Sequence, residues 1–275
     1  MLTDYHVHMR PDEGGTFAET FNAANVERYR DAADAAGISE LGVSEHIHRF
    51  QQSLAVWDHP YWREQALDDI EAYCAFVREE TDMRLGLEVD FVPGREDLTQ
   101  NLIERCELDY VVGSVHFLGD LAVDFDRYDI WADGRSPEAV WRRYYETLAA
   151  AAHSGLFDIL AHPDLVKMWG SARPAPPGDP RRYYEPALEA IADSQIAVEV
   201  STAGLRKPVG EIYPAPAFLE GVVAAGAPIA LSSDAHLPEQ IGFGYERALE
   251  LLESAGVGEL AVFERRERRL EPLGR

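Results

Sequence analysis

The chain has 275 residues, of which 46% are hydrophobic, so it is long enough to bury a large core as one domain. Asp and Glu number 49 against 25 Lys and Arg, which gives a net charge of −24. Such a charge repels nucleic-acid phosphates and argues against a long nucleic acid as partner. An anionic substrate would need local cations or a metal ion. The sequence also lacks an apolar run of about 18 residues, the length that spans a membrane.

The two cysteines indicate the cellular compartment. Cys74 and Cys106 lie in segments with a helical pattern and form no CxxC motif, so we expect reduced core residues and no disulfide framework. Side chains with ligand character begin at His6, and we therefore expect no signal peptide ahead of them. Together these features predict a cytoplasmic protein.

Segments with helical periodicity alternate along the chain with short apolar, β-branched segments. The first expected helix, 22–37, places Val26, Tyr29 and Ala33 on one face and ends at Gly37. The expected strands are 2–8, 38–46, 83–91, 110–116, 157–164, 196–201 and 227–236, and the expected helices are 22–37, 61–80, 95–106, 136–155, 181–195 and 215–226. Apolar strands with little polar alternation indicate a parallel sheet covered by helices.

This repetition predicts a single α/β domain over residues 1–275, as either a closed seven-stranded barrel or an open doubly wound sheet. In a barrel the carboxyl ends of all strands surround one mouth, whereas an open sheet binds ligands at one switch point. Two connections, 118–135 and 168–181, are long, and they are rich in aromatic residues and proline respectively. We expect them to form lids or substrate walls. We expect no domain boundary, and no low-complexity tail apart from the charged C-terminal segment "ERRERRLEP".

The motif "HVH" at residues 6–8 lies at the end of the first expected strand. Because side chains alternate along a strand, His6 and His8 point to one face and Val7 to the other. Every other expected strand also ends in residues that bind metals or protons, in the motifs SEH, EVD, VH, AHPD, EVS and SDAH. These motifs bring His6, His8, His46, Glu88, His116, His162, Asp234 and His236 to strand ends. The pattern favours the barrel, in which all of these ends meet.

Such a cluster predicts bound cations. Two carboxylates ~4 Å apart repel by about 4 kcal/mol at an effective dielectric of 20, and a metal ion turns this repulsion into binding. Imidazole and carboxylate ligands suit zinc, iron or manganese. At three or four ligands per ion, we expect two or three divalent ions. Neighbouring ions that share a carboxylate would hold a bridging hydroxide, a suitable nucleophile for attack on phosphorus.

The ordered motifs "SEH", "GLEVDF", "GSVHF", "AHPDLVK" and "SSDAH" resemble the PHP (polymerase and histidinol phosphatase) superfamily, and "VEVSTAGLRKPVGEIYP" is similar to its histidinol-phosphatase branch. The resemblance implies a distorted seven-stranded TIM-like (β/α) barrel with a trinuclear metal site. It places His6, His8, Glu88 and Asp234 on a first metal, and Glu88, His116 and His162 on a second. A third would take His46, His236 and an acid after "HVH", where this chain has "RPDEGG" instead of a histidine; Asp12 is the first candidate and Glu13 the second.

Phosphate recognition needs arginine or lysine. The chain has only two lysines, Lys167 and Lys207, and both follow expected strands. The candidates for substrate binding are Arg10, His48, Lys167, Arg206 and Lys207. Glu88, Asp234 and His236 are the candidate catalytic residues, with Asp234 or His236 passing a proton to the leaving alkoxide. Glu199 would support the site without binding metal. Asp120, Asp124, Trp131 and Trp169 are candidates for the wall that receives an amine and an imidazole.

The resemblance implies a metal-dependent phosphatase that hydrolyses L-histidinol phosphate to L-histidinol and phosphate, a step of histidine biosynthesis. Another small phosphomonoester or a nucleotide phosphodiester is the first alternative. HxHxR also resembles cyclic amidohydrolases, but these often use a bridging lysine, and no lysine precedes Lys167 here. A barrel without catalytic activity is a third alternative, which loss of ligands would reveal. The sequence leaves the metal identity and the oligomeric state open.

Overall fold

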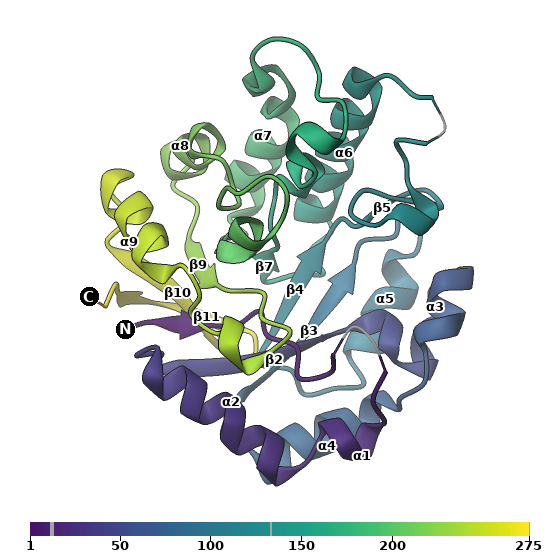
Figure 1. Cartoon of the computed structure of the whole chain (residues 1–275), viewed down its shortest axis with the longest axis vertical. Coiled ribbons are helices and arrows are strands. Elements are labelled where there is room, and N and C mark those ends of the chain that lie inside the picture. The colour runs from purple at the N-terminus through teal and green to yellow at the C-terminus, as the bar shows by residue number, and fades with distance from the viewer. Residues whose placement is uncertain (12–13, 133, 275) are drawn as a thin grey trace.

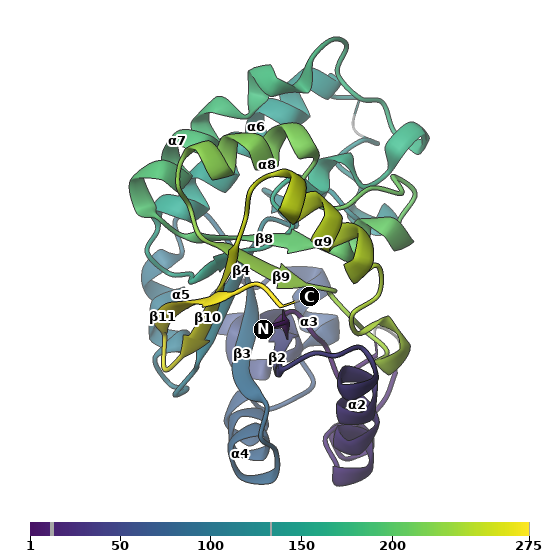
Figure 2. The same ribbon diagram turned by 90° about the vertical axis from the view of Figure 1, so that its left-hand side faces the viewer.

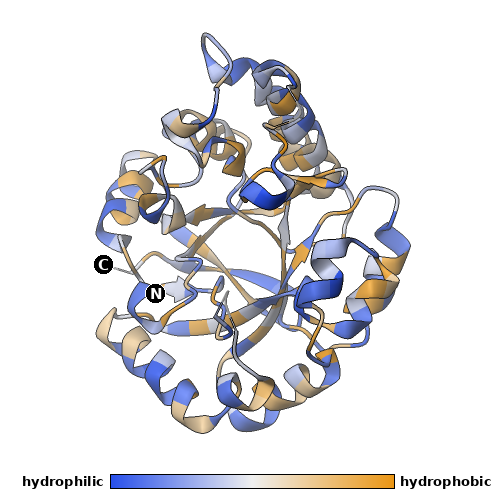
Figure 3. Cartoon of the chain, turned by 45° about the vertical axis from the view of Figure 1, so that its right-hand side comes forward, coloured by the Kyte–Doolittle hydropathy of each residue, from blue (hydrophilic) through white to orange (hydrophobic). Residues whose placement is uncertain are grey.

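The computed structural model describes residues 1–11, 14–132 and 134–274. Seven parallel strands form one sheet in the order β1-β2-β3-β4-β7-β8-β9, and Figure 3 shows them as a ring around a common centre with helices outside. The strands are β1 (Thr3–Asp4), β2 (Glu40–His46), β3 (Arg84–Asp90), β4 (Tyr110–Ser114), β7 (Ile159–Leu160), β8 (Ala197–Ser201) and β9 (Ile229–Ser232). The predicted seven-stranded α/β barrel is therefore confirmed.

The ring closes between its first and last strands. Beyond β1, Val7 forms a parallel bridge with Ala235, which follows β9. The amide of His8 donates to the carbonyl oxygen of Ala235 over 2.7 Å, and the amide of Ala235 donates to that of His6 over 3.1 Å. The first strand was expected over residues 2–8 and is regular only over Thr3–Asp4. The bridge keeps the alternation that directs His6 and His8 to one side.

Helices cover the outside of the ring (Figure 1). Several begin at a capping side chain: Asn22 accepts from the amide of Asn25, Asp69 from that of Ala72, and Ser136 from that of Ala139. The helices are α1 (Phe17–Thr20), α2 (Ala23–Ala35), α3 (Pro60–Gln65), α4 (Ile70–Glu80), α5 (Glu96–Ile103), α6 (Pro137–His153), α7 (Glu185–Ser194), α8 (Pro216–Ala224) and α9 (Tyr245–Ser254). None of them, within the residues described, combines the length and apolar character needed to cross a bilayer.

The single helix expected over 61–80 is wrong, because the chain divides there into α3 and α4. The amides of Leu67 and Asp68 donate to the carbonyl oxygen of Arg49 instead of continuing the helix. Asp69 then caps α4. The periodicity was misleading because Trp62 and Ile70 are both fully buried, each in its own helix.

A hairpin that the sequence did not predict seals the amino-terminal end of the barrel (Figure 2). β10 (Glu259–Glu264) pairs antiparallel with β11 (Glu267–Pro272). Phe263 of β10 packs against the rings of Tyr5 and Tyr110 inside the barrel, at centroid distances of 6.0 and 6.5 Å. Gly86 leaves room for the Tyr110 ring, which a Cβ atom at this position would meet. The opposite end of the barrel stays open, and the strand-end residues gather there.

Candidate functional site

The carboxyl ends of the strands surround a cavity of about 390 Å³. Its floor is formed by strand-end histidines and acids, and its wall by aromatic residues that include Tyr61, Phe117 and Phe125. The lining residues are His46, His48, Tyr61, Gln65, Glu88, His116, Phe117, Asp124, Phe125, His162, Leu165, Met168, Lys207, Tyr213, Asp234 and His236. The cavity therefore lies where a parallel barrel is expected to hold its active site.

Glu88, near the end of β3, is the centre of the cluster. Its Oε2 lies 3.3 Å from Nε2 of His6, 3.5 Å from Nε2 of His8 and 2.5 Å from Nδ1 of His46. Its Oε1 lies 3.4 Å from Nε2 of His116 and 3.3 Å from Nε2 of His162. One carboxylate thus faces imidazoles on both sides, which is the arrangement expected of a ligand that bridges two ions.

The ligand atoms fall into four groups in which all atoms lie within 4.8 Å of one another. The structure brings together the residues expected for the first two metals, and Asp234 Oδ1 lies 3.5 Å from Nε2 of His8. For the third site His8 joins His46 and His236, whereas Asp12 and Glu13 lie outside the described residues. The groups are His6, His8 and Glu88; Glu88, His116 and His162; His6, His162 and Asp234; and His8, His46 and His236.

The chemistry of these residues fits cations. His6 and His8 are fully buried, and Nε2 of each lacks a hydrogen-bond partner among the described atoms. Buried polar atoms are rarely left without partners, because their desolvation is costly. A divalent ion coordinated by these nitrogens and by Glu88 would satisfy them.

Two further carboxylates orient the histidines from behind. Nδ1 of His6 lies 2.8 Å from Glu199, whose other oxygen accepts from the amide of His162 over 2.7 Å. Nδ1 of His116 lies 2.7 Å from Asp90. Such contacts fix an imidazole so that Nε2 faces the metal. Glu199 occupies the supporting position expected from the sequence, whereas Asp90 was missed. Asp90 lies two residues after Glu88, so strand alternation alone could have found it.

Burial and neighbouring charge set the protonation of the cluster. Burial lowers the pKa of His46 to about 3, and burial together with His46 and His236 holds the pKa of His8 well below its usual value. Burial favours a neutral Glu88, but the surrounding histidines outweigh it and hold its pKa well below the ordinary range. Two histidines respond in the opposite direction despite burial: Glu199 and Glu88 hold the pKa of His6 well above its usual value, and Glu88 and Asp90 raise the pKa of His116 to about 10. Metal binding would release these protons, because neutral imidazoles and an ionised carboxylate are the forms that bind metals.

The turn after β9 holds Asp234 in a left-handed conformation with φ of +53°. A non-glycine residue in this region costs about 1 kcal/mol or more unless its surroundings enforce it. Asp4 provides one restraint, accepting from the amide of Ser233 over 2.9 Å and from its hydroxyl over 2.5 Å. Arg206 provides another, since its Nη2 donates to the carbonyl oxygens of Ser233 and Asp234, both over 2.8 Å.

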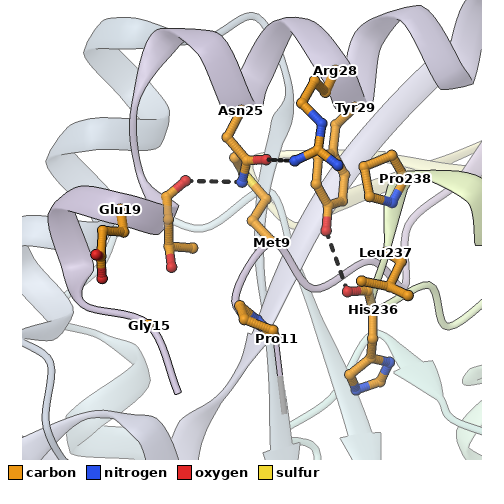
Figure 4. A pocket seen from close by; sticks show the side chains of 11 residues that line it. Met9, Pro11, Gly15, Glu19, Asn25, Arg28, Tyr29, His236, Leu237 and Pro238 are labelled. Carbon is orange, nitrogen blue, oxygen red and sulfur yellow. Dashed lines mark hydrogen bonds between the residues drawn. The ribbon is translucent and has the colours of Figure 1, made fainter. Parts of the chain in front are cut away.

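A second cavity lies beside this turn, between α2 and the loop after β9 (Figure 4). The hydroxyl of Tyr29 donates to the carbonyl oxygen of His8 over 2.8 Å and lies 3.5 Å from that of His236. In Figure 4 Tyr29 reaches from α2 toward His236. One side chain thus links the two strand ends that close the barrel.

The expected phosphate-binding residues separate into two sets. Lys207 and His48 line the main cavity, and Lys207 has no ion-pair partner among the residues that the structure describes. The other three are engaged outside this lining. Lys167 pairs with Asp164 over 2.9 Å, Arg10 forms a buried ion pair with Asp68, and Arg206 holds the turn after β9. The direct phosphate contact predicted for Arg10, Lys167 and Arg206 stays a prediction.

The expected substrate wall is also only partly present in the cavity. Asp124 lines it, and its Oδ1 is buried without a hydrogen-bond partner among the described atoms. Tyr61, Phe117 and Phe125 form the adjoining aromatic surface, with the rings of Tyr61 and Phe125 4.8 Å apart. Asp120, Trp131 and Trp169 are not in the lining. The indole of Trp169 instead donates to the carbonyl oxygen of Val123.

The fold and the ligand cluster define a metal-dependent enzyme of the TIM-like barrel class. A family model described as the PHP domain matches residues 19–203, and the chain belongs to this family. It is 35% identical over 251 residues to a probable histidinol-phosphatase of Deinococcus radiodurans, an alignment that covers 89% of this chain and 91% of that protein. A probable histidinol-phosphatase of Clostridium acetobutylicum is 25% identical over 268 residues, covering 94% and 95%.

A solved structure shares the whole fold. It is histidinol phosphate phosphatase from Lactococcus lactis, complexed with zinc, L-histidinol and phosphate. The two chains superpose with a TM-score of 0.70 over 98% of each, at 22% sequence identity. The likeness establishes a common barrel.

Proposed function

We propose that the protein is a metal-dependent phosphomonoesterase that hydrolyses L-histidinol phosphate to L-histidinol and phosphate. The observation that carries the proposal is the arrangement around Glu88, whose two oxygens face five imidazoles at the carboxyl ends of the strands. The family and the names of the relatives favour histidinol phosphate as the substrate.

The position of each residue in the cluster assigns its role in metal binding. Glu88 would bridge two of the two or three divalent ions that we expect, with His6, His8 and Asp234 on one side and His116 and His162 on the other. Zinc, iron or manganese bound there would supply a Lewis acid and would activate water for attack on phosphorus. Glu199 and Asp90 would keep the Nε2 atoms of His6 and His116 directed inward.

Side chains that line the cavity would neutralise the negative charge of the phosphate. The ammonium of Lys207 would neutralise a phosphoryl oxygen, and His48 would contact the same end of the substrate. Asp234 or His236 would pass a proton to the leaving alkoxide, directly or through water. Both line the cavity and belong to the turn that Asp4 and Arg206 hold.

The amine and imidazole of histidinol would occupy the wall. Burial raises the pKa of Asp124 above its ordinary value because it disfavours the ionised carboxylate, and an ammonium group bound at the unpartnered oxygen would offset that cost. The rings of Tyr61 and Phe125 offer a surface on which an imidazole can stack. This wall would distinguish histidinol phosphate from simple phosphate esters.

Phosphate release from a panel of substrates tests the proposal. The panel contains L-histidinol phosphate, an aryl phosphate and a dinucleotide phosphodiester, each with the metal-replete protein. We expect histidinol phosphate to be hydrolysed with the highest kcat/KM. In Asp124→Asn this preference should fall by about 10-fold or more, while Asp97→Asn, an exposed control on α5, should keep it.

Three other outcomes would reject the proposal. Equal rates on histidinol phosphate and the aryl phosphate would indicate a promiscuous phosphatase. Preference for the dinucleotide would indicate a phosphodiesterase. Absence of phosphate release from every substrate, with the ions bound, would favour a barrel without this activity.

A further inference from the structure

The two cysteines are in direct contact, far from each other in sequence. Sγ of Cys74, on α4, lies 2.7 Å from Sγ of Cys106, which follows α5. This separation is only roughly 0.7 Å longer than a covalent disulfide bond of about 2.05 Å. The sequence predicted two separate core thiols, and their proximity depends on how α4 and the end of α5 pack.

Polar contacts on both sides of Cys74 and Cys106 keep the two thiols close together. One turn before Cys74, Glu71 forms an ion pair with Arg105. One turn after it, Arg78 pairs with Asp109 over 2.7 Å and also donates to the carbonyl oxygen of Glu107. The segment 105–109 is therefore attached to α4 at two points, and the thiols between them have little freedom to separate.

The pair can be reached from the surface. Cys106 lines a groove of about 340 Å³ that also contains Arg265 and Arg266. Cys74 is partly exposed. The two arginines belong to the turn between β10 and β11, and they share the groove with Glu104 and Glu107, so a small zwitterionic reagent meets charges of both signs there. A hydrogen bond from the Cys74 thiol lowers the pKa of Cys106, which makes Cys106 the better nucleophile of the two.

We propose that Cys74 and Cys106 are a modification site that forms an intramolecular disulfide by exchange with a low-molecular-weight disulfide such as glutathione disulfide. The Cys106 thiolate attacks one sulfur of the reagent, forms a mixed disulfide and expels the first small thiolate. Cys74 then loses its proton to water and attacks the Cys106 sulfur, which expels the second small thiolate. The two cysteines are oxidised, and the reagent is reduced to two thiols.

The expected consequence is greater stability without a change in turnover. The crosslink closes a loop over residues 74–106, which contains β3 with Glu88 and Asp90. Closing a loop restricts the unfolded chain and raises Tm. Cys106 lies just before β4, toward the end of the barrel that the β10–β11 hairpin covers, so the crosslink should leave the opposite, open end unchanged.

Redox titration of the full-length protein tests the site. Metal-replete protein is equilibrated in buffers with increasing ratios of oxidised to reduced glutathione, quenched with iodoacetamide, and examined by intact mass and peptide mapping. We expect conversion from two alkylated thiols to one Cys74–Cys106 disulfide, with a mass lower by two hydrogen atoms than that of the reduced, unalkylated chain. The oxidised form should have a Tm higher by about 5 °C or more. Its kcat should agree with that of the reduced form within about twofold.

Serine variants resolve the order of the steps. Cys74→Ser should accumulate a stable glutathione adduct on Cys106, because the second thiol is absent, whereas Cys106→Ser should form an adduct more slowly. If either variant fails to fold, the number of alkylated thiols in the wild-type chain still tests whether the disulfide forms. Any of three results for the wild-type chain would overturn the proposal. These are two alkylated thiols at the most oxidising ratio, a glutathione adduct that persists, or a disulfide that forms only between chains. An oxidised form no more stable than the reduced one would do the same.

Discussion

The guanidinium of Arg206 donates a 2.8 Å hydrogen bond to the carbonyl oxygen of Asp234, which joins the loop after β8 to the turn after β9. The turn needs such support because Asp234 adopts φ of +53° while its carboxylate faces His6 and His8. The guanidinium is partly buried, and its Nη1 has no hydrogen-bond partner among the described atoms. Arg206 thus has one nitrogen that holds the turn and a second, buried nitrogen that makes no hydrogen bond to the described residues.

Replacing Arg206 tests whether its guanidinium positions Asp234 or binds the phosphate. If it acts by positioning Asp234, Arg206→Gln should lower kcat by about 10- to 1000-fold and reduce the metal content, while KM for histidinol phosphate changes little. Arg206→Lys should recover only part of the loss, since an ammonium cannot reproduce the planar guanidinium. Steady-state kinetics and elemental analysis provide the measurements, with the exposed Arg181→Gln as control. A raised KM at unchanged kcat and metal content would instead assign Arg206 to direct phosphate binding, as the sequence predicted.

Replacing Glu88 should lower activity and metal content more than replacing any other single ligand. We expect two to three divalent ions per chain, and the loss of at least one in Glu88→Gln, because a neutral amide cannot bridge two cations. Activity should fall by more than about 100-fold. Elemental analysis and phosphate release check this prediction, with Glu79→Gln, at an exposed position of α4, as the matched control. Full metal content with near wild-type turnover in Glu88→Gln would contradict the bridging role.

The strand-end residues could be predicted because local rules determine them. Alternation along a strand directs His6 and His8 to one face, and parallel strands deliver their carboxyl ends to one mouth. The same alternation places Asp90 on the face of Glu88, so its supporting contact with His116 was also within reach of sequence reasoning.

The remaining features depend on tertiary partners that no local pattern reveals. The break between α3 and α4 arises because Arg49 offers its carbonyl oxygen to two amides of that segment. The C-terminal hairpin was missed because most of β11 is exposed and charged, so only β10 carries a buried pattern. Long cationic side chains are the hardest to place, as Lys167 illustrates by turning to the buried Asp164.

Asp4 should give the protein a measurable pH dependence of stability. Burial raises its pKa to about 6, although hydrogen bonds from Ser233 oppose this. Because the folded pKa exceeds the unfolded value of about 3.9, the native state holds the proton more tightly. The protonated Asp4 carboxyl therefore stabilises the folded state fully below a pH of about 3.9, and this stabilisation is lost as the pH rises through 6.

The expected effect is that wild type loses about 1–3 kcal/mol of unfolding free energy relative to Asp4→Asn between pH 4 and pH 6.5, because Asn cannot ionise. Urea unfolding of both proteins in chelator, at several pH values, gives this difference. Asp97→Asn, an exposed control on α5, should show no such trend relative to wild type. A constant difference between wild type and Asp4→Asn across the range would refute the prediction.

The two lysines of the chain offer a matched comparison at the substrate site. Lys207 lines the cavity without an ion-pair partner among the residues described, so Lys207→Met should raise KM for histidinol phosphate by about 10-fold or more while leaving Tm nearly unchanged. Lys167 pairs with the buried Asp164, so Lys167→Met should lower Tm, because it leaves that carboxylate without its partner. Kinetics with histidinol phosphate and thermal unfolding separate the two roles. If the KM increase appeared in Lys167→Met and not in Lys207→Met, the cation that meets the phosphate would be the one on the loop after β7.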